Sequence, residues 1–127
     1  MSATGSGLIG KLVGKIGSKA GGAFAGAAPN IAGKLGEQAV RAIANVGEKV
    51  LVKLKDGTKI IPDGITRKIV TEIKNVKYQS YTKQLKNYVK FAKETGRKVE
   101  LWMRRGSKVS DTILKEKAIT VRWYNLP

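Results

Sequence analysis

The stretch that decides the fold reads Ile60-Ile61-Pro62-Asp63-Gly64 and then, after a short gap, Lys68-Ile69-Val70-Thr71-Glu72-Ile73-Lys74-Asn75. The second part alternates as a β-strand does, with successive side chains on opposite faces. Glu72 and Lys74 therefore share one face with Val70, while the other face is mostly apolar. The Pro-Asp-Gly bend brings a second carboxylate, Asp63, close to this pair. Two carboxylates beside an ammonium group predict a site for a divalent metal ion.

The chain is strongly basic, with 25 Lys and Arg residues against 9 Asp and Glu residues and a formal net charge of +16 over 127 residues. A charge this large favours a polyanionic partner, most often nucleic acid and less often an acidic membrane surface or an acidic protein. Asp63 and Glu72 are two of only nine acidic residues. Their placement at one locus favours a functional site over an ordinary charged pair on a strand surface.

The chain contains no Cys and no His. This composition excludes disulfides, thiolate metal sites, His-based acid-base catalysis, and Ser-His or Cys-His nucleophile pairs. If the protein is an enzyme, its chemistry depends on carboxylates, Lys and a hard cation bound through oxygen.

The apolar periodicity predicts a single α/β domain built on a mixed sheet. The predicted elements are a helix over 36–45, a hairpin of strands over 49–54 and 58–61, a strand over 66–74, a helix over 78–95, a strand over 99–103, a short helix over 110–117 and a last strand over 119–123. Asp56-Gly57 is predicted to form the turn of the hairpin, because Gly accepts the positive φ of a tight turn. Gly47 and Gly96 mark the ends of the two longer helices.

Residues 1–35 are predicted to be a flexible leader rich in Gly and Ala, and residues 36–127 to be the folded domain. An amphipathic pattern over residues 8–19 predicts a basic helix that its glycines weaken. Two interpretations of the leader stay open. It is either a delivery segment that touches a membrane or a carrier, or a flexible remnant of a longer parent chain, which its low-complexity composition favours.

Pro62-Asp63 followed by Glu72-Ile73-Lys74 resembles the signature of the PD-(D/E)XK nucleases, the restriction-endonuclease-like superfamily. The order of predicted elements is similar to the αβββαβ core of that fold. A narrower likeness extends over residues 36–103, where Glu-x-Lys-Asn precedes Tyr78-Gln79 and a helix near Gln84-Leu85. This pattern resembles the restriction-endonuclease-fold toxin domains at the C-termini of bacterial polymorphic toxins.

The resemblance implies a metal-dependent nuclease toxin, an interbacterial effector that hydrolyses phosphodiester bonds. DNA is favoured over tRNA as the substrate, because most relatives act on DNA. The resemblance also implies a larger secreted parent polypeptide or delivery system, release from a bacterium, and action in the cytoplasm of the target cell. A cognate immunity protein is expected to be acidic, because the toxin is basic.

The chemistry assigns roles to the residues of the motif. Asp63 and Glu72 would hold Mg²⁺ or Mn²⁺, together with the backbone carbonyl of Ile73. Lys74 would stabilise charge on the phosphate or orient the attacking water. Glu37 has two interpretations, as a further ligand of the metal or as a helix-dipole partner in the first turn of its helix.

Other polar residues have a binding role or an ordinary surface role. Gln84, with Gln79 upstream, would hydrogen-bond substrate or water, or is simply an exposed amide. Tyr81, Tyr88 and Trp102 are expected in the core rather than stacked on bases. The residues predicted to neutralise phosphates are Lys77, Lys83, Lys86, Lys90, Arg104 and Arg105, with Arg97 and Lys98 nearby. The alternative function is a noncatalytic nucleic-acid-binding protein that uses the same basic surface.

Overall fold

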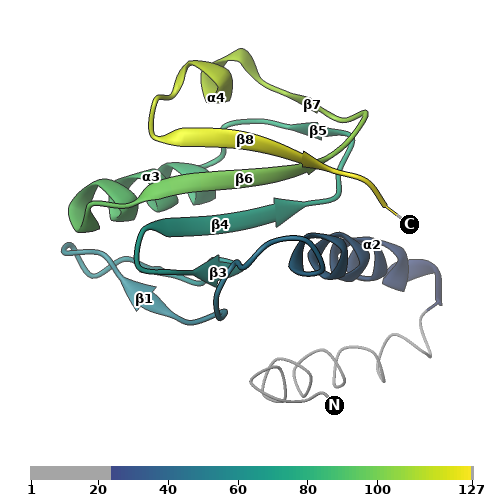
Figure 1. Ribbon diagram of the computed structural model, residues 1–127, viewed down its shortest axis with the longest axis horizontal. Helices are drawn as coiled ribbons and strands as arrows, with labels where there is room; N and C mark the ends of the chain where they lie inside the picture. The colour runs from purple at the N-terminus through teal and green to yellow at the C-terminus, as the bar shows by residue number, and fades with distance from the viewer. Residues whose placement is uncertain (1–23, 127) are drawn as a thin grey trace.

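The computed structural model describes residues 24–126, so the amphipathic pattern over residues 8–19 lies outside the described residues. Its centre is a mixed four-stranded sheet in the order β3 (Gly64–Ile65), β4 (Ile69–Lys74), β6 (Lys98–Arg104) and β8 (Ile119–Tyr124) (Figure 1). β3 runs antiparallel to β4, whereas β4, β6 and β8 are parallel to one another. The predicted mixed α/β architecture is therefore confirmed.

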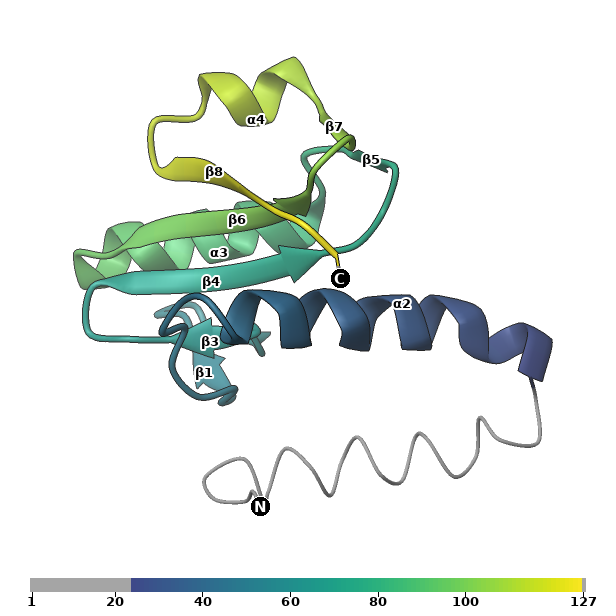
Figure 2. The ribbon, with the colours of Figure 1, turned by 45° about the vertical axis from the view of Figure 1, so that its right-hand side comes forward.

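Helices cover both faces of this sheet. α3 (Lys83–Thr95) lies behind the sheet in Figure 1, and α4 (Asp111–Lys115) contributes to the same core. α2 (Phe24–Arg41) packs on the opposite face and extends past the end of the sheet (Figure 2). The central strands are therefore enclosed from both sides, which explains why β4 is buried along most of its length.

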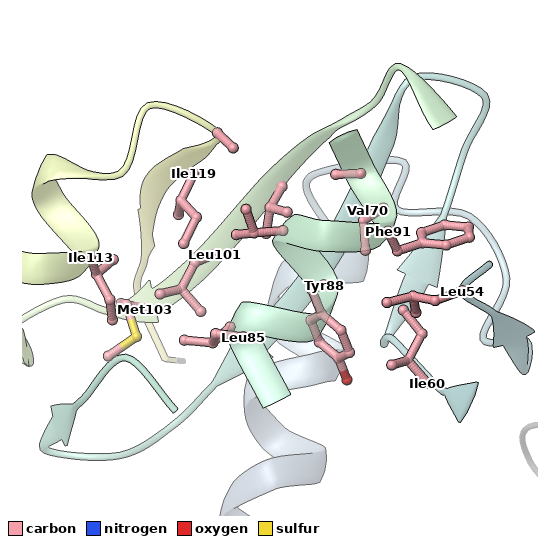
Figure 3. Close-up of a cluster of buried hydrophobic side chains, with 14 residues drawn as sticks. Leu54, Ile60, Val70, Leu85, Tyr88, Phe91, Leu101, Met103, Ile113 and Ile119 are labelled. Carbon is pink, nitrogen blue, oxygen red and sulfur yellow. The ribbon is translucent and has the colours of Figure 1, made fainter. Parts of the chain in front are cut away.

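The larger core lies between α3 and the sheet. Figure 3 shows its side chains converging from α3, β4, β6 and α4, with Leu85 and Leu101 fully buried. Burying a side chain of this size contributes about 1.5–3 kcal/mol relative to leaving it exposed. A smaller cluster on the other face consists of Val40, Val46, Ile73, Trp102 and Tyr124. Because Leu101 and Trp102 are neighbours on β6 that point to opposite faces, one strand supplies both clusters.

α2 differs from the prediction, since it begins at Phe24 and ends at Arg41 instead of covering residues 36–45. It runs through the predicted boundary between residues 35 and 36, and that domain boundary stays a prediction. Glycine weakens an isolated helix, but packing on a sheet supplies most of a helix's stability in a protein. No helix among residues 24–126 is long and apolar enough to cross a membrane.

Gly36 explains how closely α2 approaches the sheet. A Cβ atom at this position would meet the hydroxyl oxygen of Tyr124, and it would lie 3.1 Å from the Cβ of Asn75. Gly36 is buried, whereas Gly96, which ends α3, is exposed. The lack of a side chain at Gly36 therefore allows close packing. The prediction that the helix begins at Gly36 is wrong.

The predicted hairpin is present but does not join the main sheet. β1 (Val52–Lys53) and β2 (Lys59–Ile60) pair antiparallel in a sheet of their own, with Gly57 at φ +90° in the turn. Pro62 follows closely and has no N–H to donate to a partner strand. β3 pairs with β4 instead. The resemblance to the αβββαβ core implied that the two hairpin strands join the core sheet, and this expectation is wrong because β1 and β2 form a separate sheet.

α3 begins at Lys83, whereas the predicted helix began at Tyr78. Tyr78–Gln79 forms a short strand, β5, which pairs in parallel with β7 (Lys108–Val109). Thr82 caps the helix, because its side chain accepts a hydrogen bond from the N–H of Leu85 at 3.3 Å, a contact of about 1 kcal/mol. The predicted end at Gly96 is confirmed, with φ +70°.

The remaining elements agree with the prediction within a few residues. β4 begins at Ile69 and not at residue 66, because the N–H of Thr66 donates to the carbonyl of Ile69 in a tight turn. β6 and β8 confirm the strands predicted over 99–103 and 119–123. Ser110 caps α4 as predicted, its side chain accepting from the N–H of Ile113.

Candidate active site

The Pro-Asp bend, the end of β4 and α2 surround one cleft of about 360 Å³. This volume is in the range of sites that hold small ligands. Two larger depressions in the described part of the chain, of about 590 Å³ each, contain no pair of carboxylates. The cleft is lined by Asn30, Gly33, Lys34, Glu37, Lys49, Asp63, Glu72, Ile73, Lys74, Asn75 and Val76.

Backbone N–H groups hold the two predicted metal-binding carboxylates side by side. The N–H of Asp63 donates to Oε1 of Glu72 at 3.3 Å, and the N–H of Ile73 donates to Oδ2 of Asp63 at 2.8 Å. Glu72 is only 5% exposed, and the Asp63 side chain is 15% exposed. The bend and the strand therefore fix both carboxylates at the edge of the core, where water screens them little.

Glu72 is an unusual acid in this setting. Burial raises its pKa from 4.5 to about 8, and the neighbouring Asp63 charge acts in the same direction. Lys74 opposes the shift, because its Nζ lies 3.3 Å from Oε2 of Glu72. Lys74 also donates to Oε1 of Gln84 on α3 at 3.1 Å. The structure thus brings together four of the predicted site residues, Asp63, Glu72, Lys74 and Gln84.

Tyr88 lies behind the carboxylates, on the core side. Its hydroxyl donates to the carbonyl of Ile61 at 3.3 Å, and Figure 3 shows the ring among the core side chains. Burial, followed by the negative charges of Glu72 and Asp63, raises the pKa of Tyr88 far above its usual range. The hydroxyl therefore stays protonated, and Tyr88 belongs to the core as predicted.

The free energy of unfolding of the metal-free protein is expected to fall as the pH rises from about 4.5 to about 8. Folded Glu72 keeps its proton over this interval, whereas an unfolded carboxyl group loses it. The resulting stability is complete below the unfolded pKa and is lost as the pH passes the folded pKa. No His titrates in this interval, since the chain has none. Urea unfolding in EDTA at a series of pH values checks this, and a Glu72→Gln variant that loses stability equally would contradict it.

The donors at this site fit a divalent cation bound through oxygen. Two adjacent carboxylates repel each other, and a cation relieves that repulsion. The N–H and C=O of one residue in a strand point to the same side, so the carbonyl of Ile73 points to the side of Asp63. Residues 24–126 hold no cluster of three or more His, Cys, Asp or Glu side chains suited to a metal. Mg²⁺ does not require one, because it binds through one or two carboxylates and keeps several waters.

Glu37 lines the same cleft but does not contact the Asp63–Glu72 pair. Its Oε2 lies 3.2 Å from Nε of Arg41, and its Oε1 lies 3.9 Å from Nζ of Lys49. Nζ of Lys49 also lies 3.3 Å from Oδ1 of Asp63, so Lys49 lies between the carboxylates of Glu37 and Asp63. The role of Glu37 as a metal ligand stays a prediction. Its alternative role in the first turn of a helix is wrong, because α2 begins at Phe24 and Glu37 lies in its last part.

Sequence reasoning missed Arg41 and Lys49. Arg41 donates from Nη2 to the carbonyl of Asp63 at 2.7 Å and from Nη1 to the carbonyl of Gly47 at 2.8 Å, so it ties α2 to the bend. The spacing of Glu37 and Arg41, four residues apart on a helix, marks their ion pair. No local pattern marks the contact of Arg41 with Asp63, because it joins segments far apart in the sequence.

The end of β4 is held by elements from both ends of the described chain. The hydroxyl of Tyr124, on β8, donates to the carbonyl of Lys74 at 2.9 Å. The side-chain amide of Asn75 donates to the carbonyl of Ala32, on α2, at 2.8 Å. Together with Arg41, these contacts position the strand that carries the motif.

Some of the predicted nucleic-acid-binding residues lie near the site. Lys83 begins α3 beside Gln84, and Lys77 lies three residues after the end of β4. Arg104 ends β6 at the same edge of the sheet as Lys74, because β4 and β6 are parallel. Arg105, which follows it, is exposed and donates to Oδ1 of Asn125 at 3.0 Å.

The other predicted basic residues lie further along α3 or are already engaged. Lys90 is 2.6 Å from Asp56 in the hairpin turn, and this contact holds the pKa of Asp56 well below its usual range. Lys86 lies over the ring of Tyr81, with 5.7 Å between Nζ and the ring centre. Arg97 donates to the carbonyl of Thr66 at 2.9 Å. These contacts place part of the basic surface away from the cleft.

The chain was compared with protein families, curated proteins and solved structures. The comparisons with curated proteins and with solved structures gave no match. A family model described as restriction endonuclease fold toxin 7 matches residues 33–113. This match covers more than half of the chain and includes the bend, β4 and α3, so it confirms the predicted resemblance. The chain therefore belongs to the restriction endonuclease fold toxin 7 family.

Proposed function

We propose that this toxin domain is a metal-dependent nuclease that hydrolyses phosphodiester bonds, with DNA as the favoured substrate. The observation that carries the proposal is the buried pair of Asp63 and Glu72, with Lys74 lying 3.3 Å from Glu72. Membership of the family implies a nuclease toxin. A net charge of +16 supports a polyanionic substrate.

The motif residues divide the work in this proposal. Asp63, Glu72 and the carbonyl of Ile73 bind Mg²⁺ or Mn²⁺. The bound ion supplies a positive charge to a phosphate oxygen and lowers the pKa of a coordinated water. Lys74 stabilises the negative charge that develops on the phosphate, and Gln84 holds its Nζ in place through the 3.1 Å contact.

The substrate backbone would lie along the C-terminal edge of the parallel strands. Lys77, Lys83, Arg104 and Arg105 are at this edge, so they are assigned to phosphates on either side of the cleaved bond. Contacts with phosphates bind nucleic acid without reading its sequence, and they weaken steeply as salt is added. Lys86 and Lys90 would add a longer-range attraction.

Delivery from a producing bacterium into the cytoplasm of a target cell belongs to the same proposal, as does a larger parent polypeptide. Protection of the producer would require an immunity protein that covers the cleft or the basic edge. An acidic surface on that partner would match the charge of this chain and speed their association.

Incubation with plasmid DNA and, separately, with total tRNA tests the function. Magnesium-dependent loss of the DNA is expected, and EDTA should abolish it because the ion is removed from Asp63 and Glu72. Glu94→Gln is a matched control, since Glu94 accepts a hydrogen bond from the N–H of Lys55 away from the cleft. Loss of tRNA instead of DNA would change the substrate. If both were bound and neither was cut with Mg²⁺ or Mn²⁺, the protein would be a noncatalytic nucleic-acid-binding protein.

A further inference from the structure

α2 has one side that packs on the sheet and another that lines the cleft. Asn30, Gly33, Lys34 and Glu37 recur at helical spacing, so they share one side of the helix. Gly36 faces the sheet instead, where Tyr124 leaves no room for a side chain. Residues 30–34 belong to the segment that was predicted to be a leader, yet they lie in the same cleft as Asp63 and Glu72.

The three lysines of the cleft differ in their partners. Lys49 contacts Asp63 and Glu37, and Lys74 contacts Glu72. Among the side chains that the structure describes, no carboxylate lies within ion-pair distance of Lys34. The charge of Lys34 is therefore available to an anion that enters the cleft.

No residue within 24–126 gives Gly33 a packing reason to be glycine. Among the described residues, a Cβ atom there would meet no heavy atom within 4 Å, in contrast to Gly36 one turn along the helix. Glycine inside a helix costs about 1 kcal/mol relative to alanine, so this position gives up helix stability without gaining a close contact. What the missing side chain does leave is space on the cleft side of α2.

We propose that Asn30, Gly33 and Lys34 form a nucleic-acid-binding wall of the cleft. Lys34 and the amide of Asn30 contact phosphates of the strand that is cut, and Gly33 leaves room for its backbone to pass. Lys and Asn side chains donate to phosphate oxygens, so this wall positions the strand without selecting bases. The inference rests on the proposed nuclease function for the identity of the anion as nucleic acid.

Lys34→Gln tests the charge of the wall. The whole chain is used with Glu72→Gln as the parent variant, so that a labelled DNA duplex is bound without being cut. Losing one phosphate contact should lower the slope of log K against log salt by about 0.9, which weakens binding about eightfold at roughly 0.1 M salt. Lys117→Gln removes the same charge from an exposed position in the turn before β8, and it should change neither quantity.

Gly33→Gln tests the space beside α2. Its side chain should enter the cleft and weaken binding by about tenfold or more, while the midpoint of thermal unfolding does not fall, because Gln is a better helix former than Gly. Gly36→Ala should instead lower the midpoint of thermal unfolding, because its Cβ would meet the hydroxyl oxygen of Tyr124.

The outcomes separate this inference from the proposed function. If Lys34→Gln and Gly33→Gln bind DNA as the parent variant does, or if the parent variant does not bind DNA, the wall is wrong, whether or not the unsubstituted chain cuts DNA. If the unsubstituted chain cuts neither DNA nor tRNA with Mg²⁺ or Mn²⁺, the nuclease proposal fails. A reduced salt slope for Lys34→Gln would then still support the wall as a nucleic-acid-binding surface.

Discussion

Replacing Glu72 by Gln is expected to lower the rate of cleavage by about a thousandfold or more, which corresponds to about 4 kcal/mol of transition-state stabilisation. Gln keeps the shape of Glu but removes the charge that we propose binds the cation. Binding of nucleic acid should change little, because the basic residues that are proposed to contact phosphates are unaffected. Initial rates on supercoiled plasmid and binding to a labelled duplex measure the two effects separately.

The same variant distinguishes loss of chemistry from loss of folding. Glu72 is 5% exposed, and burial raises its pKa to about 8, so its charge is unfavourable in the metal-free protein. The neutral amide should therefore make the protein more stable above neutral pH while cleavage is lost. Full activity in Glu72→Gln, beside an equally active Glu94→Gln control, would remove Glu72 from the catalytic site.

Replacing Arg41 by Met is expected to have the second-largest effect. Arg41 holds the carbonyls of Asp63 and Gly47 and contacts Glu37, and Met keeps the length of the side chain without the donors. Leaving these partly buried acceptors unpaired should reduce the free energy of unfolding by about 2–3 kcal/mol. Displacement of Asp63 by about 1 Å should lower the cleavage rate about a hundredfold.

Two further variants control this experiment. Arg41→Lys keeps the charge but cannot donate to three acceptors in a planar fork, so it should recover little of the lost activity. Arg67→Met, at an exposed position in the turn between β3 and β4, should leave stability and cleavage unchanged. Urea unfolding and plasmid cleavage, both at a temperature where every variant is folded, are the measurements. Wild-type cleavage by Arg41→Lys would show that charge alone positions the bend.

The sequence was most informative where local patterns carry the structure. The alternation in Ile69–Lys74 and the bend at Pro62-Asp63 were sufficient to predict that Asp63, Glu72 and Lys74 lie together. The alternation did not predict that Glu72 is almost completely buried. Alternation describes the two faces of a strand, but what covers each face depends on helices that lie elsewhere in the sequence.

α2 shows why the other features could not be predicted. Gly33 and Gly36 argue against a helix when propensity alone is considered, and only the packing of Gly36 against Tyr124 shows why the second glycine is tolerated. The same helix brings Lys34 to the cleft and Arg41 to the bend. These contacts join segments that have no common period or spacing, so a single sequence carries no signal for them.

The support of β4 from β8 has a consequence for the time at which the toxin becomes active during synthesis. A ribosome that has reached Asn75 has already made the whole Pro-Asp and Glu-x-Lys sequence, but Tyr124, whose hydroxyl holds the carbonyl of Lys74, has not yet been added. β6, which lies between β4 and β8 in the sheet, is also still missing at that point. A nascent chain of that length therefore carries the motif without its support, so we expect the site to reach its final geometry only after β8 has been made.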